Sequence, residues 1–465
     1  MATPRSPHSG SGLIRTMKVA GLLTALGFWF FGYGQAVNRV SDATAGLQTT
    51  GGHSNRARIS ADGRFIAFDS YATNFVPGDT RPIIRVFVHN RSTGTTKFVS
   101  GAMGGSHPDD NNSVTAALSA DGRYIVFASG VTNLVPGDTN QQTDIFVYDR
   151  LTEETKRVNV ASDGAQAFGG PSASPSISAD GRFVAFASSA VNLVPGDTNG
   201  LKDIFVHDRQ TGATTRVSVA TGGGQPAGGG SDHSAISADG RFIAFDSDAT
   251  DLVPDDTNGF ADIFVHDRVT GTTQRVSVDT GGAQAVGGDS RHPAISADGR
   301  FVAFHSEATN LGPGDTNEFA DIFVHDRVAG TTQRVSVDTG GGQAIGGHSF
   351  FPSISADGRY VAFQSDATNL VPNDTNGKRD IFVHDRQTGA TTRVSVATGG
   401  GQALGGGAAR PSISADGRYV AFESGATNLV PDDTNDLTDI FVHDRETNRT
   451  TRVSMVTDDT ASKAP

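Results

Sequence analysis

The chain has 465 residues, a net charge of −13 at pH 7 and no cysteine. This acidic balance, without any offsetting cluster of Lys and Arg, excludes nucleic acid as a partner. The absence of cysteine excludes disulfides, thiol catalysis and Cys–zinc sites, so stability must come from packing alone.

Residues 1–36 form the first predicted segment and differ in character from the rest. They contain three basic residues, no Asp or Glu, and an apolar run over 19–31 that ends shortly before Gly34-Gln35-Ala36. This layout predicts a signal peptide cleaved after Ala36, with Met17 as an alternative start. The apolar run is shorter than the roughly 20 residues that span a bilayer, although an uncleaved anchor is the other interpretation. We therefore predict a secreted or periplasmic protein that is not inserted in a membrane after cleavage.

A 59-residue repeat accounts for nearly all of the remaining chain. The pentapeptide Ser-Ala-Asp-Gly-Arg recurs at this spacing without insertion or deletion. Its seven copies begin at Ser60, Ser119, Ser178, Ser237, Ser296, Ser355 and Ser414. A fixed period of this size is typical of repeat architectures such as solenoids and propellers.

Each repeat has four segments with the composition of strands. In the third copy these are 175–178, 183–188, 203–208 and 214–219, joined alternately by tight turns and longer Gly-, Asn- and Pro-rich connections. The third segment is apolar on both faces, which is typical of a sheet covered on both sides. Seven units of four antiparallel strands predict an all-β, seven-bladed β-propeller over 37–455, followed by a disordered tail over 456–465.

The repeats contain one outer strand too many for this ring. Val37–Ser41 matches the fourth strand of the repeat, yet the last repeat also ends with its own copy at Thr451–Ser454. Either the N-terminal segment pairs into the last blade and closes the ring, or one of the two copies is unpaired.

The run Ile-Ser-Ala-Asp-Gly-Arg-Phe-Val-Ala-Phe, followed by Asp-Ile-Phe-Val-His-Asp-Arg, resembles the WD40-like (PD40-type) repeat of the TolB-like propeller family. Repeats of that family typically begin Ser-Pro-Asp-Gly-Lys, whereas this chain has Ala in place of Pro and a longer connection between the second and third strands. The resemblance covers all seven copies and implies an exported binding propeller. It is not to TolB itself, because the small α/β domain of TolB has no counterpart here.

Antiparallel order places the two longer connections of every repeat on one face of the ring, where binding sites usually lie. Three positions beside these loops differ between repeats while their neighbours are constant. We predict that they form a solvent-facing ligand surface at the channel mouth, although free drift of exposed positions in duplicated repeats would explain the variation equally well. The predicted ligand-binding residues are Asp69, Tyr71, His233, Asp246, Asp248, His292, His305, Glu307, Gln364, Asp366, Arg410 and Glu423.

The long loop of six repeats carries Asp-Thr-Asn-x-x-x-Asp. Alternating oxygen ligands resemble the later half of a calcium loop, but the first half and a bidentate Glu are missing. Asp and Asn also shape turns through bonds to the backbone, and on this interpretation the protein requires no cofactor. The candidate calcium ligands are Asp197, Asn199, Asp203, Asp256, Asn258 and Asp262.

A His-Asp pair ends the third strand in five copies, as in His207-Asp208. Because no serine nucleophile is singled out and one active site does not need five copies, we predict a structural pair and no catalytic residue. Together these features predict a monomeric binding module for a protein partner or a small, saccharide-like ligand. The alternative is an extracytoplasmic hydrolase or lyase with its site at the channel mouth.

Overall fold

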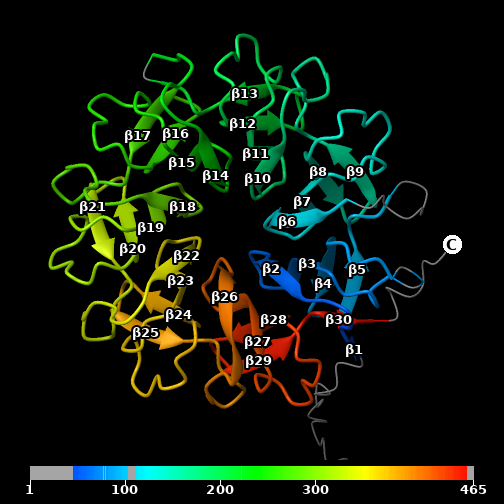
Figure 1. Ribbon diagram of the computed structural model, residues 1–465, viewed down its shortest axis with the longest axis vertical. Helices are drawn as coiled ribbons and strands as arrows, with labels where there is room; N and C mark the ends of the chain where they lie inside the picture. Colours follow the sequence, from blue (N-terminus) through cyan, green and yellow to red (C-terminus); the bar gives the residue numbers. More distant parts are fainter. Residues whose placement is uncertain (1–45, 77, 79, 103–110, 221, 458–465) are drawn as a thin grey trace, which may run out of the picture. The chain divides into compact units, whose positions relative to one another are not determined.

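The computed structural model describes residues 46–76, 78, 80–102, 111–220 and 222–457. The predicted signal peptide, the segment Val37–Ser41 and residues 458–465 lie outside this range. The described chain folds into seven four-stranded antiparallel sheets around a central channel (Figure 1), so the predicted all-β, seven-bladed β-propeller is confirmed. Within that range there is no helix with the length and hydropathy of a membrane span.

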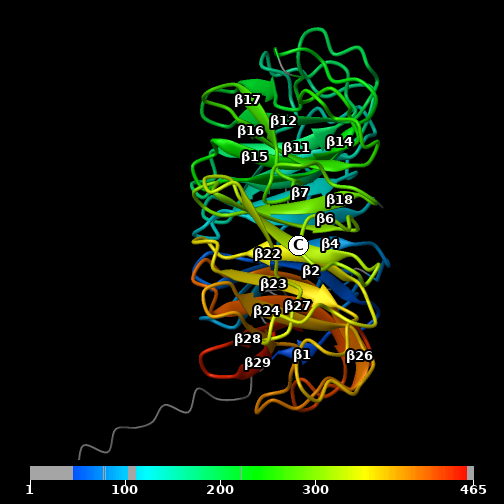
Figure 2. The same ribbon diagram turned by 90° about the vertical axis from the view of Figure 1, so that its left-hand side faces the viewer.

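Every blade is built from one repeat, and its strands follow chain order from the channel outward. Seen from the side (Figure 2), the connections between strands gather at the two faces of the ring. The blades are β2 (Ser54–Ile59), β3 (Phe65–Ser70), β4 (Arg85–Asn90) and β5 (Thr95–Phe98); β6 (Ser113–Leu118), β7 (Tyr124–Ser129), β8 (Asp144–Asp149) and β9 (Glu154–Arg157); β10 (Ser172–Ile177), β11 (Phe183–Ser188), β12 (Asp203–Asp208) and β13 (Thr214–Arg216); β14 (Ser231–Ile236), β15 (Phe242–Ser247), β16 (Asp262–Asp267) and β17 (Thr272–Arg275); β18 (Ser290–Ile295), β19 (Phe301–Ser306), β20 (Asp321–Asp326) and β21 (Thr331–Arg334); β22 (Ser349–Ile354), β23 (Tyr360–Ser365), β24 (Asp380–Asp385) and β25 (Ala390–Arg393); and β26 (Gly405–Ile413), β27 (Tyr419–Ala426), β28 (Asp439–Asp444) and β29 (Arg449–Arg452).

The hydrophobic core lies between neighbouring blades rather than within one. Ala185 and Val206 of the third blade pack in one cluster with Ile243 and Phe245 of the fourth. All six residues of β12 are buried, as the apolar composition of the third segment predicts. Each blade therefore has both faces covered by its neighbours, which is why no single repeat can bury its apolar side chains alone.

The Ser-Ala-Asp-Gly-Arg turns join the blades on the short-turn face. In the third blade the ring of Phe183 lies between two guanidinium groups, that of Arg182 at 4.6 Å and that of Arg268 from the next blade at 4.4 Å. The same arrangement recurs in all seven blades and crosses the junction between the last blade and the first, where Arg91 lies 4.2 Å from the ring of Tyr419. Such cation–π contacts contribute about 0.5–2 kcal/mol each.

The alanines of these turns form a closed ring of seven backbone hydrogen bonds. Each alanine N–H donates to the alanine C=O of the next blade at 2.9–3.0 Å, and Ala415 donates to Ala61 across the junction. Proline has no N–H, so Ser-Pro-Asp-Gly turns could not form this ring. The substitution of Ala for Pro thus has a structural consequence: it ties the inner ends of all seven blades together. The ring members are Ala61, Ala120, Ala179, Ala238, Ala297, Ala356 and Ala415.

The two ends of the described chain meet in a short extra sheet. β1 (Leu47–Gln48) pairs antiparallel with β30 (Met455–Val456), so Val456, which we expected in the disordered tail, is in a strand. The pairing of Gln48 with Met455 repeats the bridge that Val160 makes with Gln166 inside a continuous link. The two chain ends therefore rebuild, in two pieces, the link that follows the fourth strand in the other blades. The outer edge of the last blade is β29, the last repeat's own copy.

Candidate ligand site in the channel

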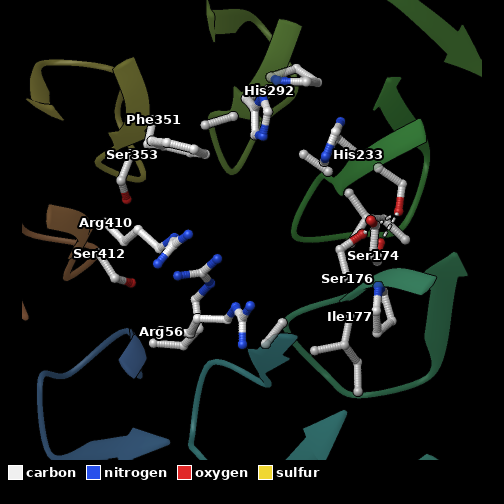
Figure 3. A pocket seen from close by; sticks show the side chains of 18 of the residues that line it. Arg56, Ser174, Ser176, Ile177, His233, His292, Phe351, Ser353, Arg410 and Ser412 are labelled. Atoms are coloured by element: carbon white, nitrogen blue, oxygen red, sulfur yellow. Dashed lines mark hydrogen bonds between the residues drawn. The ribbon is translucent and has the colours of Figure 1, made fainter. Parts of the chain in front are cut away.

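The channel contains a cavity of about 760 Å³ that the first strands of all seven blades line (Figure 3). One level of this lining is the position four residues before each motif serine, which varies from repeat to repeat. At this level lie Arg56, Ser174, His233, His292, Phe351 and Arg410. The structure thus brings together His233, His292 and Arg410 of the predicted ligand-binding residues.

A β-bulge produces this convergence. The register of the first and second strands shifts beside each of these residues, for example between Asp232 and Ala235. The φ angles at this level lie between 49° and 55°, including 55° at His292 and 52° at Phe351. A left-handed backbone at bulky residues is unusual and costs about 1–3 kcal/mol each, and such conformations concentrate at functional sites. A bulge re-aims a side chain, here into the cavity.

Five further predicted residues lie behind this level and not on a solvent-facing rim. Asp69, Asp246, His305, Gln364 and Glu423 are 0–8% exposed. They occupy the second strand of their blades, which is covered on both faces, so their expected exposure was wrong.

Three of these buried groups pair with the channel residue of the same blade. Arg56 lies 3.0 Å from Asp69 and Arg410 lies 2.8 Å from Glu423. The His233 ring lies 2.9 Å from Asp246. The second strand therefore holds the channel side chains in place.

Glu423 and Gln364, two of the five buried residues, also contact the next blade. The backbone N–H of Arg56 donates to Glu423 Oε2 at 2.7 Å, and that of Arg410 donates to Gln364 Oε1 at 2.9 Å. Because a left-handed residue at a bulge has no ladder partner for its N–H, these side chains satisfy it.

Tyr71, Asp248, Glu307 and Asp366 do not join the cavity lining. They follow the second strand on the long-loop face, where Asp248 pairs with Arg291 at 3.0 Å and Asp366 with Arg379 at 2.9 Å. Sequence variation alone could not separate these loop positions from the channel positions.

Arg58 is a channel residue that the sequence analysis missed. It lines the cavity two positions after Arg56, on β2. The other six repeats have only Ala or Ser at this position, so the single Arg was a detectable signal. Those residues are Ala117, Ser176, Ala235, Ala294, Ser353 and Ser412.

The cavity has two walls of different chemistry. Arg56 and Arg410, from neighbouring blades, extend into it on one side, with His292 and His233 on the other (Figure 3). The rings of His233 and His292 stack with centroids 3.9 Å apart, and His292 meets Phe351 edge-on at 4.6 Å.

Burial sets the charge of these groups. It raises the pKa of Asp69 to about 7, against the opposing effect of Arg56. Burial, with the neighbouring His233 and His305, lowers the pKa of His292 to about 3, so this ring is neutral at physiological pH. For His233 burial lowers the pKa, but the hydrogen bond and charge of Asp246 outweigh it and the net direction is upward.

The buried ion pairs make a first testable prediction. Glu423→Ala removes the acceptor of both the Arg410 side chain and the Arg56 N–H, and should lower the free energy of unfolding by about 2–3 kcal/mol. Arg410→Ser combined with Glu423→Ala reproduces the Ser174 and Ala187 pair of the third repeat, and should recover part of that loss. Urea unfolding followed by circular dichroism measures both free energies. If Glu423→Ala alone were as stable as the wild type, the contacts of Glu423 with Arg410 and Arg56 would not stabilise the protein as expected.

In the Asp-Thr-Asn-x-x-x-Asp loops, arginine of the fourth strand lies beside both carboxylates. Arg275 Nη1 is 3.0 Å from Asp256 Oδ1 and 3.5 Å from Asp262 Oδ2. Asn258 donates to Asp262 and to a backbone carbonyl, while its oxygen accepts a backbone N–H. Arg216 is placed in the same way at Asp197 and Asp203. The oxygens that would bind calcium are thus engaged by donors within the protein, which favours the turn interpretation. Among the residues that the structure describes, no group of three or more His, Asp or Glu is arranged to hold a metal ion.

Chelation tests the calcium alternative directly. We expect EDTA to leave the melting temperature unchanged, because a guanidinium already lies beside each carboxylate pair and calcium needs six to eight oxygen ligands. Differential scanning calorimetry with EDTA and with added calcium checks this. A fall in melting temperature on chelation, restored by calcium, would establish the metal site.

The His-Asp pairs have structural contacts. The His207 ring lies 2.9 Å from Thr214 Oγ1, and that hydroxyl donates to the carbonyl of Val160 in the preceding blade. Asp208 accepts two hydrogen bonds from Arg182, at 2.9 and 2.7 Å. The two side chains thus serve different contacts and do not form a triad.

No family model and no curated protein matches the chain. Solved structures with a similar fold include a prolyl endopeptidase, with a TM-score of 0.55, 13% identity and coverage of 88% of this chain and 50% of that one. The β-propeller domain of the trilobed protease from Pyrococcus furiosus matches with a TM-score of 0.52 and 12% identity, covering 88% and 99% of the two chains. A putative TolB from Agrobacterium tumefaciens has a TM-score of 0.40 and 16% identity over 66% and 86%. The chain spans half the length of the prolyl endopeptidase, and at these identities the likeness shows the fold alone.

Proposed function

We propose that this protein is an exported, monomeric β-propeller that binds a small ligand in its channel. One observation carries the proposal: at one position that varies between otherwise near-identical repeats, the side chains, among them Arg56, His233, His292 and Arg410, converge at one level of one cavity. Residues that drift freely would not require a bulge and a left-handed backbone at the same position, as seen at the six residues described at this level.

The size of the cavity favours a small ligand over a protein partner. Small-molecule sites typically enclose about 300–1,000 Å³ and combine an apolar lining with a few placed polar groups. The channel, at about 760 Å³, combines apolar residues such as Ile177 and Pro293 with a few charged and aromatic side chains.

A single introduced tryptophan can test the proposal. Trp29 is the only Trp in the sequence, so Trp29→Phe gives a protein without tryptophan fluorescence. In that background Ser174→Trp places a reporter in the cavity, at a position where Phe351 shows that a large aromatic side chain fits. Gln210→Trp, exposed in the turn after β12, is the matched control.

Citrate, pyrophosphate, choline and glucose sample the anionic, cationic and neutral classes of ligand. We expect a saturable change in the fluorescence of Ser174→Trp with at least one of them and none with Gln210→Trp. No saturable response in any class would contradict channel binding. Chemical conversion of the bound compound would instead support the hydrolase or lyase alternative.

A further inference from the structure

We propose that the cationic wall of the channel is an anion subsite, in which Arg56, Arg58 and Arg410 bind a small ligand bearing carboxylate or phosphate groups. This rests on the proposed function and names the class of ligand.

The three arginines come from two neighbouring blades and share one side of the cavity. Arg56 and Arg58 are on β2 of the first blade, and Arg410 is on β26 of the last. The guanidinium groups of Arg56 and Arg410 extend into the cavity together (Figure 3). Their side chains are 38% and 37% exposed, so a solute in the channel can reach them.

Their buried partners hold these groups without consuming their donors. Arg56 donates to Asp69 through Nη1, and Arg410 donates to Glu423 through Nη1. A guanidinium has five N–H donors in a planar fork that matches carboxylate and phosphate oxygens. Most of the donors of Arg56 and Arg410 therefore remain for a ligand in the channel.

The charge balance of the wall is positive although the protein is acidic. Among the described residues that line the cavity there are three arginines and neither Asp nor Glu. The carboxylates of Asp69 and Glu423 lie behind this lining, where they hold Arg56 and Arg410. A bound anion would meet the guanidinium groups in a site partly withdrawn from water, where ionic contacts are stronger than in bulk solvent.

Asp69 links this subsite to pH. It faces Arg56 and Arg58 of β2 and Glu423 of β27, and burial raises its pKa to about 7. As the pH falls from 8 to 6, Asp69 takes up a proton and the wall gains net positive charge. Protonation of His233, whose pKa is also raised, acts in the same direction. Anion affinity should therefore increase as the pH falls.

The repeats supply variants that remove each arginine while reproducing residues the fold already contains. Arg58→Ser introduces the residue found at Ser176. Arg56→Ser with Asp69→Ala, and Arg410→Ser with Glu423→Ala, each reproduce the Ser174 and Ala187 pair and leave no buried carboxylate unpaired. Lys156 has an exposed side chain outside the channel. Lys156→Ser therefore removes one positive charge without changing the channel, and serves as the control for a change in net charge.

Calorimetric titration of the full chain with citrate and with pyrophosphate measures the effect. We expect each arginine variant to bind at least about tenfold more weakly than wild type, since it loses charge-assisted hydrogen bonds to the anion. Lys156→Ser should bind as wild type does, and wild-type affinity should be higher at pH 6 than at pH 8. The stronger of the two anions identifies carboxylate or phosphate as the preferred group.

Wild-type affinity in a folded Arg58→Ser protein would overturn the subsite. So would a wild-type protein that binds choline or glucose but neither anion, although the proposed function would then stand. If none of the compounds bound in the reporter experiment, both the proposed function and the anion subsite would be wrong.

Discussion

Replacement of Gly240 by Val should lower the free energy of unfolding by about 2–5 kcal/mol. Gly240 has a φ of 74°, and a Cβ at this position would lie 2.3 Å from Cδ2 of Phe183 in the neighbouring blade. The left-handed backbone costs a residue with a side chain about 1–2 kcal/mol. Forcing extra atoms against a packed ring adds about 1–3 kcal/mol. Urea unfolding followed by circular dichroism measures the loss.

Gly212→Val separates the two contributions. Gly212 has a φ of 77° and no atom within 4 Å of its ideal Cβ, so this variant carries the backbone strain alone. It should be less destabilised than Gly240→Val by the cost of displacing the Phe183 ring. Equal losses in the two variants would mean that the ring moves aside freely. Because Gly240 itself does not line the cavity, ligand binding by folded Gly240→Val should be unchanged.

The strands could be predicted closely because the repeat shows the same pattern seven times. The expected second and third strands of the third copy, 183–188 and 203–208, coincide with β11 and β12. The fourth was expected over 214–219, but β13 ends at Arg216. From Val217 the chain enters the link to the next blade, and a composition typical of strands cannot show where ladder pairing stops.

The candidate site could be located from sequence only in part. Comparison of the repeats identified the level of His233 and Arg410, because residues that break an otherwise constant pattern stand out. It could not show that Asp246 and Glu423 are buried, since a strand covered on both faces has no alternation to reveal which side chains reach solvent. The left-handed bulge was also hidden, because Arg, His and Phe carry no signal for a positive φ as Gly does.

The cationic wall could not be predicted from the overall charge of the chain. The net charge of −13 gives no indication of a cationic site. Many acidic residues are engaged in structural ion pairs within the blades, as at Asp208 and Asp262. Three of the arginines that break the repeat, Arg56, Arg58 and Arg410, line the channel. Composition averages over the whole surface, whereas a binding site depends on the few positions that depart from the average.

The second large effect concerns closure of the ring. Deletion of residues 455–465 should lower the free energy of unfolding by about 3–6 kcal/mol, because it removes β30. Thr96 then loses two hydrogen bonds, from its hydroxyl to the Met455 carbonyl at 2.8 Å and from its N–H to Thr457 at 3.0 Å. The deletion also exposes the apolar surface that Met455, itself 5% exposed, now covers. Each buried hydrogen bond contributes about 1 kcal/mol and a buried Met side chain about 1.5–3 kcal/mol. Calorimetric melting of the truncated protein provides the measurement.

Deletion of residues 37–41 is the matched comparison, because closure of the ring by this segment is one of the two alternatives that the sequence left open. In the described structure β29 already forms the outer edge of the last blade, so strand exchange by Val37–Ser41 would have to displace or flank it. If the pairing of β1 with β30 closes the ring, deletion of 37–41 should lower the melting temperature less than deletion of 455–465. A larger effect would mean that the N-terminal copy competes successfully for that edge. The order of the two melting temperatures therefore decides between closure by strand exchange and closure by a link made from both chain ends.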